Sequence, residues 1–318
     1  MIYFVMFAQL RQFLDILISD FLHIFMPLSL RTSGNYSTIT RDKRITKRYN
    51  LHYLDGMMLL NGKKILILGF ASKRSIAFGI ACSLAEHGAE IVLSVANDKL
   101  AQRAKLDCDH IPDLSIFTLD VSEEKNIEQT MQAIHKDHPI IDGIVHAVAY
   151  APKESLQGHI TDNLTSEGFH SSLNISVYSF LKIAKYAPQL MPNGGSMCAL
   201  SYIGANQAFP GYNLMGIAKA SLEASIRYLA LDMGKYQIRV NGISAGPIRT
   251  LASSAIGDFR NMLDHSEKNS PLDGNVTIEE VGDCATYLLS HLSRGTTGDV
   301  IYVDHGYHST GALSVNKE

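Results

Sequence analysis

From residue 63 onwards the sequence alternates between short apolar runs and longer amphipathic stretches, and this feature restricts the fold more than any other. The short runs have the composition of buried strands in a parallel sheet, and they cover residues 63–69, 89–95, 115–121, 141–150, 195–201, 238–244 and 299–304. Apolar residues at helical spacing fill the intervals, most clearly over residues 75–88, 123–137, 164–190, 213–233 and 277–291. The alternation predicts an α/β fold, a doubly wound parallel sheet of the Rossmann type with about seven strands and helices on both faces.

Composition narrows the classes of function. The chain has 318 residues, of which 46% are hydrophobic, and a formal net charge of −3, so it can bury a large core and has no basic footprint for nucleic acid. The four cysteines, Cys82, Cys108, Cys198 and Cys284, stand apart without a CxxC motif. We therefore expect free thiols in a reducing compartment such as the cytoplasm, and no metal site.

Residues 1–56 differ from the rest of the chain. The first part is apolar, but Arg11, Asp15 and Asp20 interrupt it, so no uncharged run reaches the roughly 18 residues of a transmembrane helix, and we expect no stable membrane insertion. The stretch that follows is basic and contains Ser and Thr, as transit peptides to a plastid or other organelle do. We expect residues 1–56 to be an extension outside the fold and residues 57–318 to form a single domain. An upstream start codon, organelle targeting and membrane association stay open as explanations of the extension.

The segment GFASKRSIAFG (69–79) joins the first predicted strand to the first helix and is a candidate phosphate-binding turn. Gly69 permits a tight turn, and a helix that starts near Ser75 directs backbone N–H groups and its positive dipole end at an anion. The glycine pattern GxGxxG is missing, so we expect the Ser75 hydroxyl to donate to the pyrophosphate and Gly79 to let the helix pack closely on the sheet. A turn with only a structural role is the alternative.

The end of the second predicted strand indicates which dinucleotide would bind. NAD sites place an acidic residue there for the ribose hydroxyls, whereas NADP sites place a basic one. Here the tip, residues 96–97, has no basic residue before Lys99, which favours NADH over NADPH. Asp98 fits either a helix N-cap or a ribose ligand. Asp120 and Val121 follow the third strand and are placed to frame the adenine.

The segment SYIGANQAFPGYNLMGIAKAS (201–221) follows a predicted strand and combines tyrosines with a lysine. The spacing between Tyr212 and Lys219 corresponds to about 10.5 Å and nearly two turns of a helix, so the two residues share a face. Both side chains are long, and a phenol and an ammonium can then reach the same nicotinamide ribose. A half-buried tyrosine beside a surface lysine is the alternative, but strand ends are where this fold binds its ligands.

This segment resembles the signature of the bacterial and plastid enoyl-acyl-carrier-protein reductases, divergent members of the short-chain dehydrogenase/reductase superfamily. The resemblance continues through GFASKRSIAFG, VHAVAYAP (145–152), RVNGISAGPIRTLAS (239–253) and GDVIYVDHG (298–306), and it covers residues 58 to about 310. It implies NADH-dependent reduction of the trans-2 double bond of enoyl thioesters, an acyl carrier protein as the partner that carries the chain, and a homotetramer.

The resemblance also implies roles for single residues. Tyr212 would be the catalytic tyrosine, Lys219 the lysine that binds the ribose, and Tyr202 a second tyrosine of the active site. Ala151 would touch the substrate. The other residues implied in cofactor binding are Gly69, Ser75, Ile76, Ala96, Asp120, Val121, Val148, Ile248, Arg249, Thr250, Leu251 and Ala252.

Three places depart from the family pattern. The first strand ends in Leu68–Gly69 where the family usually has Thr-Gly, and the second ends at Ala96 where a polar residue often contacts the adenosine. The fourth strand exits through residues 146–149, His-Ala-Val-Ala, where serine and glycine are more usual. These departures bear on cofactor binding and touch no proposed catalytic group.

We expect the segment 251–272 to form a helical lid over the acyl chain. Ile256, Phe259 and Met262 recur at helical spacing and with Met215 would make an apolar slot, although ordinary core packing is the alternative. Two other functions stay open. A short-chain carbonyl or alcohol oxidoreductase would need a tyrosine at position 215, and a non-catalytic nucleotide-sensing module would be expected to lose Tyr212 or Lys219.

Overall fold

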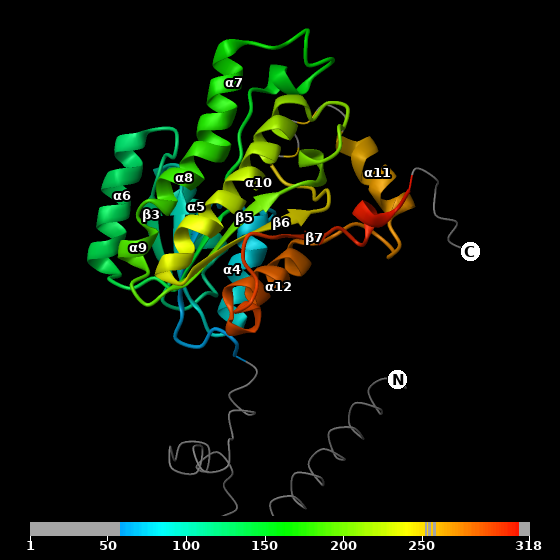
Figure 1. The fold of residues 1–318 in the computed structure, drawn as a ribbon. Coiled ribbons are helices and arrows are strands. Elements are labelled where there is room, and N and C mark those ends of the chain that lie inside the picture. Colours follow the sequence, from blue (N-terminus) through cyan, green and yellow to red (C-terminus); the bar gives the residue numbers. More distant parts are fainter. Residues whose placement is uncertain (1–57, 252, 254–255, 257–258, 312–318) are drawn as a thin grey trace, which may run out of the picture. The chain divides into compact units, whose positions relative to one another are not determined.

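The computed structural model describes residues 58–311 except 252, 254–255 and 257–258, and a seven-stranded parallel sheet lies at their centre (Figure 1). The strands are β1 (Lys64–Leu68), β2 (Glu90–Val95), β3 (Ser115–Thr118), β4 (Gly143–His146), β5 (Gly195–Ser201), β6 (Ile238–Ala245) and β7 (Val300–Val303). Their order is β3-β2-β1-β4-β5-β6-β7, and each neighbouring pair is parallel. The strand order reverses between β1 and β4, so the predicted doubly wound sheet is confirmed and its switch point is defined.

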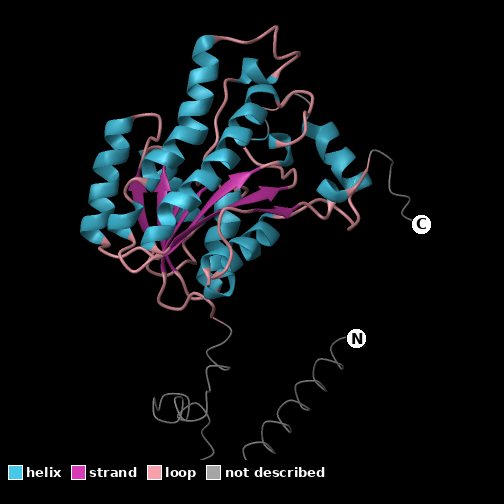
Figure 2. Ribbon diagram, viewed as in Figure 1, coloured by secondary structure: helices cyan, strands magenta, loops and turns pink. Residues whose placement is uncertain are grey.

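Helices cover both faces of this sheet (Figure 2). The α-helices described are α4 (Ile76–Glu86), α5 (Asp98–Asp107), α6 (Glu124–Asp137), α7 (Ser166–Leu173), α8 (Ser179–Ala184), α9 (Ala187–Leu190), α10 (Asn213–Met233), α11 (Phe259–Asn269) and α12 (Ile278–Leu289). Shorter 3₁₀ turns are η3 (Lys153–Leu156), η5 (Ile203–Ala205), η6 (Gly234–Tyr236), η8 (His291–Ser293) and η9 (Tyr307–Ser309), and η4 (Asn174–Tyr178) is π-helical. Buried residues of α4, α5 and α12 form one core layer with the sheet, and those of α6, α8 and α10 form the other.

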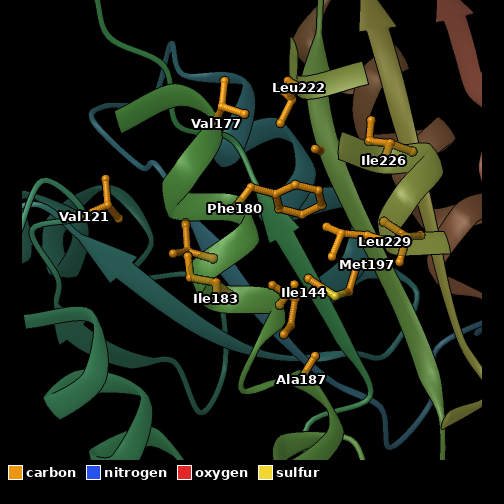
Figure 3. Packing of buried hydrophobic residues seen from close by; sticks show 14 of the residues in the cluster. Val121, Ile144, Val177, Phe180, Ile183, Ala187, Met197, Leu222, Ile226 and Leu229 are labelled. Atoms are coloured by element: carbon orange, nitrogen blue, oxygen red, sulfur yellow. The ribbon is translucent and has the colours of Figure 1, made fainter. Parts of the chain in front are cut away.

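The layer on the α8 and α10 side packs around Phe180, whose ring points from α8 towards Leu222 and Ile226 of α10 (Figure 3). Ile144 of β4 and Met197 of β5 lie beneath it, and all five side chains are fully buried. Burial of side chains of this size contributes about 1.5–3 kcal/mol each to stability. This layer therefore holds α10, the helix that contains Lys219, firmly against the sheet.

The close approach at Gly79 differs from the prediction. A Cβ added there would lie 2.4 Å from the Ile278 carbonyl oxygen, and one added at Gly282 would lie 2.7 Å from the Gly79 carbonyl oxygen. Gly79 therefore brings α4 against α12, its neighbour in the same layer, and not directly against the sheet. The two glycines let the two backbones meet without side chains between them.

The predicted helix over residues 164–190 is interrupted in the structure. The π-helical turn η4 separates α7 from α8, and in it the Ser176 hydroxyl donates to the Tyr150 carbonyl (3.1 Å) and accepts from the Tyr150 N–H (3.0 Å). α9 begins separately, with Pro188 in its first turn where the missing N–H costs nothing. The predicted strand 115–121 also ends early, at Thr118, because Asp120 turns the chain by accepting hydrogen bonds from Ser122.

The described part of the chain contains neither a candidate membrane-spanning helix nor a cluster of metal ligands. No helix there is long and apolar enough to cross a membrane. Nor do its histidines, cysteines and acidic residues gather into a group that could hold a metal ion.

Candidate active site

The parallel strands bring the predicted site residues to one edge of the sheet. The last residue of β1, Leu68, pairs with Ser94 of β2 and His146 of β4, while Ser201 of β5 pairs with Ser244 of β6. The loops that follow these strands contain the candidate phosphate turn, the strand-two tip, the β4 exit, Tyr202 and the segment 246–253. A ligand at the switch point would therefore face all of them.

The candidate phosphate-binding turn depends on a glycine for two reasons. Gly69 has φ +98°, a conformation that L side chains rarely adopt, and a Cβ there would lie 2.2 Å from the Ala147 carbonyl oxygen. Only glycine lets the β1 exit pass this close to the β4 exit. α4 then begins at Ile76, with Ser75 as its N-cap residue, so the helix N-terminus opens at the switch point.

The Ser75 hydroxyl makes a hydrogen bond within its own turn, whereas the sequence predicts that it donates to a pyrophosphate. It donates to the Ser72 carbonyl at 2.7 Å, and Ser75 itself is buried. In this conformation the hydroxyl hydrogen closes the turn and does not point outward. The structure therefore leaves the backbone N–H groups of the first turn of α4 as the donors for a pyrophosphate.

The β2 tip, where the sequence predicts contacts with the adenosine, is exposed and leads into α5. Asn97 is the N-cap of α5 and accepts from the Leu100 N–H at 3.0 Å, whereas Asp98 is the first helical residue and accepts from the Thr118 hydroxyl at 3.0 Å. The suggestion that Asp98 caps the helix is therefore wrong by one residue. Ala96 is exposed at the strand tip. Arg103 forms an ion pair with Asp107 within α5 (3.2 Å), so its side chain is not bound at the β2 tip.

Asp120 and Val121 lie after β3 but differ in exposure. Asp120 is exposed, and its carboxylate accepts from both the backbone N–H and the hydroxyl of Ser122. Val121 is 8% exposed and belongs to the core layer. One carboxylate oxygen of Asp120, Oδ1, therefore stabilises the turn that follows β3.

Tyr202 and Tyr212 meet at the β5 exit. Their ring centroids are 4.9 Å apart and the rings are inclined by 62°, the edge-to-face arrangement that aromatic pairs favour. Gly204 makes this possible, because a Cβ there would lie 2.5 Å from the Tyr212 ring and 2.9 Å from the Tyr202 ring. Within the described residues, neither phenol hydroxyl makes a hydrogen bond, so both remain available to a ligand.

Lys219 lies two turns into α10 and is 5% exposed, so it is not a surface lysine. Its Nζ donates to the Leu200 carbonyl oxygen at 2.5 Å, which directs the ammonium to the end of β5. Burial lowers the pKa of Lys219 to about 8, and the charge of Glu223 acts in the opposite direction. The lysine is therefore mostly protonated at neutral pH.

Burial also governs the tyrosines. It raises the pKa of both phenols well above the ordinary value, with a smaller contribution to Tyr212 from Tyr202 and Glu223. Both phenols are neutral hydrogen-bond donors at neutral pH. A neutral phenol can donate a hydrogen bond to a negatively charged group.

The β4 exit carries one of the departures from the family pattern. His146 is fully buried, and its Nε2 lies 2.7 Å from the Ser179 hydroxyl. Burial lowers the pKa of His146 to about 3, with Lys219 as a second cause, so the ring is neutral. His146 thus packs the β4 end against α8, while Val148 is half-buried and Ala151 buried in the segment that follows.

The segment after β6 forms a turn. The Thr250 N–H donates to the Ser253 hydroxyl (2.9 Å), and the Ser253 N–H donates to the Thr250 hydroxyl (3.1 Å). Ile248 is half-buried, and Arg249 and Leu251 are exposed. Ala252, also predicted to bind the cofactor, lies outside the described residues.

The residues of the predicted apolar slot have different neighbours in the structure. Ile256 and Met262 pack against the core layer that contains Met215, Tyr202 and Tyr212. Phe259 instead lines a cavity of about 460 Å³ together with Arg249, Thr250, Ser253, Arg260 and Leu263. Phe259 and Met262 lie in α11, which begins at Phe259, whereas Ile256 precedes this helix.

Several residues at the site escaped the sequence analysis. The Phe209 ring lies 5.5 Å from that of Tyr202, Tyr307 lies 6.4 Å from Phe209, and His265 of α11 lies 5.8 Å from Tyr307. No sequence pattern connects these aromatic residues, because each comes from a different segment. Glu223 could have been identified from the sequence, because it is a charged residue one helical turn beyond Lys219 on the same helix face.

The switch point combines a turn that only glycine permits with a helix N-terminus. The exit of β5 adds two phenols and a buried lysine. Together these features define a dinucleotide-dependent reductase of the doubly wound class. Residues 69–308 match the family model described as enoyl-(acyl carrier protein) reductase. The chain belongs to this family.

This chain aligns with known relatives over nearly the whole length of each relative. The NADH-dependent enoyl-[acyl-carrier-protein] reductase of Neisseria meningitidis is 48% identical over 259 residues, 81% of this chain and 99% of the relative. The enzyme of Anaplasma phagocytophilum, solved with NAD, is 45% identical with a TM-score of 0.78 and covers 81% of this chain and 98% of its own. The enzyme of Bacillus cereus, solved with NADP⁺ and indole naphthyridinone, is 40% identical with a TM-score of 0.78, covering 80% and 100%.

Proposed function

We propose that this protein reduces the trans-2 double bond of enoyl-acyl-carrier-protein thioesters with NADH, the last step of each cycle of fatty-acid elongation. The observation that supports this most is the pair of buried phenols in ring contact at the β5 exit, together with the buried Lys219 ammonium that donates to Leu200 near the end of the same strand. Family membership supports the substrate class, because relatives that carry this activity in their names align over 94–99% of their length.

Each group of the site has a task in this reaction. NADH, when bound, supplies the hydride to the β-carbon of the enoyl thioester. Negative charge then develops on the thioester oxygen, and Tyr212 donates a hydrogen bond to it. A preorganised donor of this kind contributes about 3–4 kcal/mol. Tyr202 supports the same oxygen and shapes the pocket, and Lys219 binds the nicotinamide ribose and keeps a positive charge nearby.

The residues proposed to bind NADH surround the switch point. Gly69 and the first turn of α4, from Ser75 and Ile76, face the pyrophosphate, and Ala96, Asp120 and Val121 face the adenosine. Val148 and residues 248–251 complete the nicotinamide side. The absence of a basic residue at the β2 tip supports NADH over NADPH, although the Bacillus cereus relative was solved with NADP⁺.

The lid and the partners follow from the same site. We assign Ala151, Met215, Ile256 and Met262 to the acyl chain, with Phe259 at the mouth beside Arg249. An acyl carrier protein presents the chain, and the active form is a homotetramer in the cytoplasm. Residues 1–56 are an extension that the reaction does not need.

The experiment is to follow the loss of NADH absorbance with crotonyl and octenoyl thioesters, with NADPH and a ketone substrate as comparisons. We expect thioester-dependent NADH oxidation and a higher kcat/KM with NADH than with NADPH. Turnover of the ketone without turnover of either thioester would identify a carbonyl reductase instead. Met215, buried at the position where that class needs its tyrosine, argues against this outcome.

A further inference from the structure

A second charged residue of α10, Glu223, is buried beside the proposed site. It follows Lys219 by one helical turn and is 6% exposed. One carboxylate oxygen accepts from the Ser201 hydroxyl at 2.5 Å, and the other accepts from the Asn206 amide at 3.2 Å. The same amide lies 3.1 Å from the Tyr302 hydroxyl of β7. A buried carboxylate is costly unless it is paired in this way.

The two donors bracket the loop that carries Tyr202. Ser201 is the last residue of β5 and directly precedes Tyr202, while Asn206 directly follows η5. The carboxylate therefore joins both ends of the loop 201–206 to α10. Since Lys219 is on α10 and Tyr212 is its N-cap residue, one side chain connects the three proposed catalytic groups.

The charge of Glu223 has a second consequence. Burial disfavours the ammonium of Lys219, and Glu223 is the group that counteracts this. Among the described residues, Lys219 acts electrostatically on His146 of β4, and Glu223 acts on Tyr212 and Tyr302. Burial lowers the pKa of His146 to about 3 and raises those of both phenols, so all three are neutral near neutral pH.

We propose that Glu223 is a positioning residue of the reductase site, which holds the Tyr202 loop against α10 and supplies the negative charge that supports the Lys219 ammonium. This inference rests on the roles proposed above for Tyr202 and Lys219. It assigns two separable effects to one carboxylate: a geometric effect through Ser201 and Asn206, and an electrostatic effect on Lys219.

The electrostatic effect is tested by binding of NADH to the full chain, measured by fluorescence as a function of pH. We expect the affinity of the unchanged protein to fall as the pH rises through about 8, when Lys219 loses its proton. In Glu223→Gln, the same fall should come about one pH unit lower, the size of effect of one partly screened charge a helical turn away. Glu223→Asp keeps the charge and should restore the original midpoint.

The geometric effect is tested with variants that leave the charge in place. Asn206→Ala changes an exposed residue, and Ser201→Ala removes one hydroxyl. We expect each to lower kcat for an enoyl thioester about 2- to 10-fold, the range for one lost hydrogen bond, with the pH midpoint of NADH binding unchanged. Thermal unfolding of every variant shows whether it is folded under the assay conditions.

Several outcomes would overturn the inference. If the pH midpoint of NADH binding is the same in Glu223→Gln as in the unchanged protein, the proposed electrostatic effect is contradicted. If the midpoint moves equally in Ser201→Ala, the shift is caused by packing and not by the charge. Full turnover in Asn206→Ala and Ser201→Ala would remove the geometric effect. Because NADH binding needs no turnover, a protein that binds NADH but reduces no thioester contradicts the proposed function while still deciding the role of Glu223.

Discussion

At the scale of single residues, burial decides the chemistry of the site. The same removal from water lowers the pKa of Lys219 and raises those of Tyr202 and Tyr212. The pKa of the lysine therefore lies close to neutral pH, whereas both phenols keep their protons at neutral pH. A buried phenol that keeps its proton serves better as a hydrogen-bond donor than as a base.

The Tyr212 hydroxyl gives the first prediction. Tyr212→Phe removes one proposed donor to the enolate oxygen and retains the ring contact with Tyr202. We expect kcat to fall about 10- to 1,000-fold with NADH affinity unchanged, because the lost interaction exists only in the transition state. Tyr202→Phe should cost less. Steady-state kinetics of both single variants and the double variant measure this.

Non-additive losses in the double variant would indicate that the two hydroxyls serve one oxygen. Full activity in Tyr212→Phe together with loss of activity in Tyr202→Phe would reverse the two assignments.

Lys219 gives the second prediction. Lys219→Met keeps an unbranched side chain in the buried space but removes the charge and the donor to Leu200. We expect kcat/KM for NADH to fall about 10- to 100-fold, mainly through a higher KM, as for loss of a charged hydrogen bond. Isothermal titration with NADH measures the binding part directly. An unchanged Kd in a folded variant would contradict the assignment of Lys219 to the ribose.

At the scale of elements, the contact between α4 and α12 positions the helix that follows the candidate phosphate turn. α12 is fixed at its start by a capping box, in which Thr277 and Glu280 bond each other's backbone N–H groups. Gly79 and Gly282 then allow the two helix backbones to touch. The position of α4, and with it the helix N-terminus at the switch point, follows from this contact.

Gly79→Ala tests that contact. The new methyl group would lie 2.4 Å from a backbone oxygen of α12, so one helix must shift. We expect the free energy of unfolding to fall by about 1–3 kcal/mol, as for overpacked cores, and NADH binding to weaken because α4 moves. Denaturant unfolding and NADH titration are the measurements.

Gly234→Ala is the matched control, since nothing lies within 4 Å of its added Cβ and its φ of −56° suits alanine. It should be neutral or stabilising by about 0.4–1 kcal/mol. Equal losses in both variants would mean that the contact between the helices has no special importance.

At the scale of the whole molecule, the domain described from Met58 onwards accounts for the site. Its sheet, its two core layers and all the proposed catalytic groups lie within residues 58–311. The relative from Neisseria meningitidis is covered over 99% of its length by 81% of this chain. These two observations support our proposal that the reaction does not need residues 1–56.

Removal of residues 1–56 gives the last prediction. A chain that starts at Met57 should keep its kcat/KM for NADH and its thermal stability within about twofold and about 2 °C, because the two described core layers and all the proposed catalytic groups belong to residues 58–311. Activity assays, calorimetry and size-exclusion chromatography of both chains measure this. Inactivity or insolubility of the shorter chain alone would make the extension part of the fold.

The sequence by itself determined the class of fold and the main residues of the candidate site. Strand and helix periodicities are local, so apolar runs of the right length predict the layers, and the seven-residue spacing predicts that Tyr212 and Lys219 share a face. Only the tertiary structure decided which segments meet. Gly69 lies against Ala147, Glu223 bonds Ser201 and Asn206, and Phe209 lies near Tyr307, because strand register and helix packing unite residues that no sequence interval connects. Burial is likewise a property of the assembled layers, and therefore the protonation of the lysine and the phenols could be derived only from the folded chain.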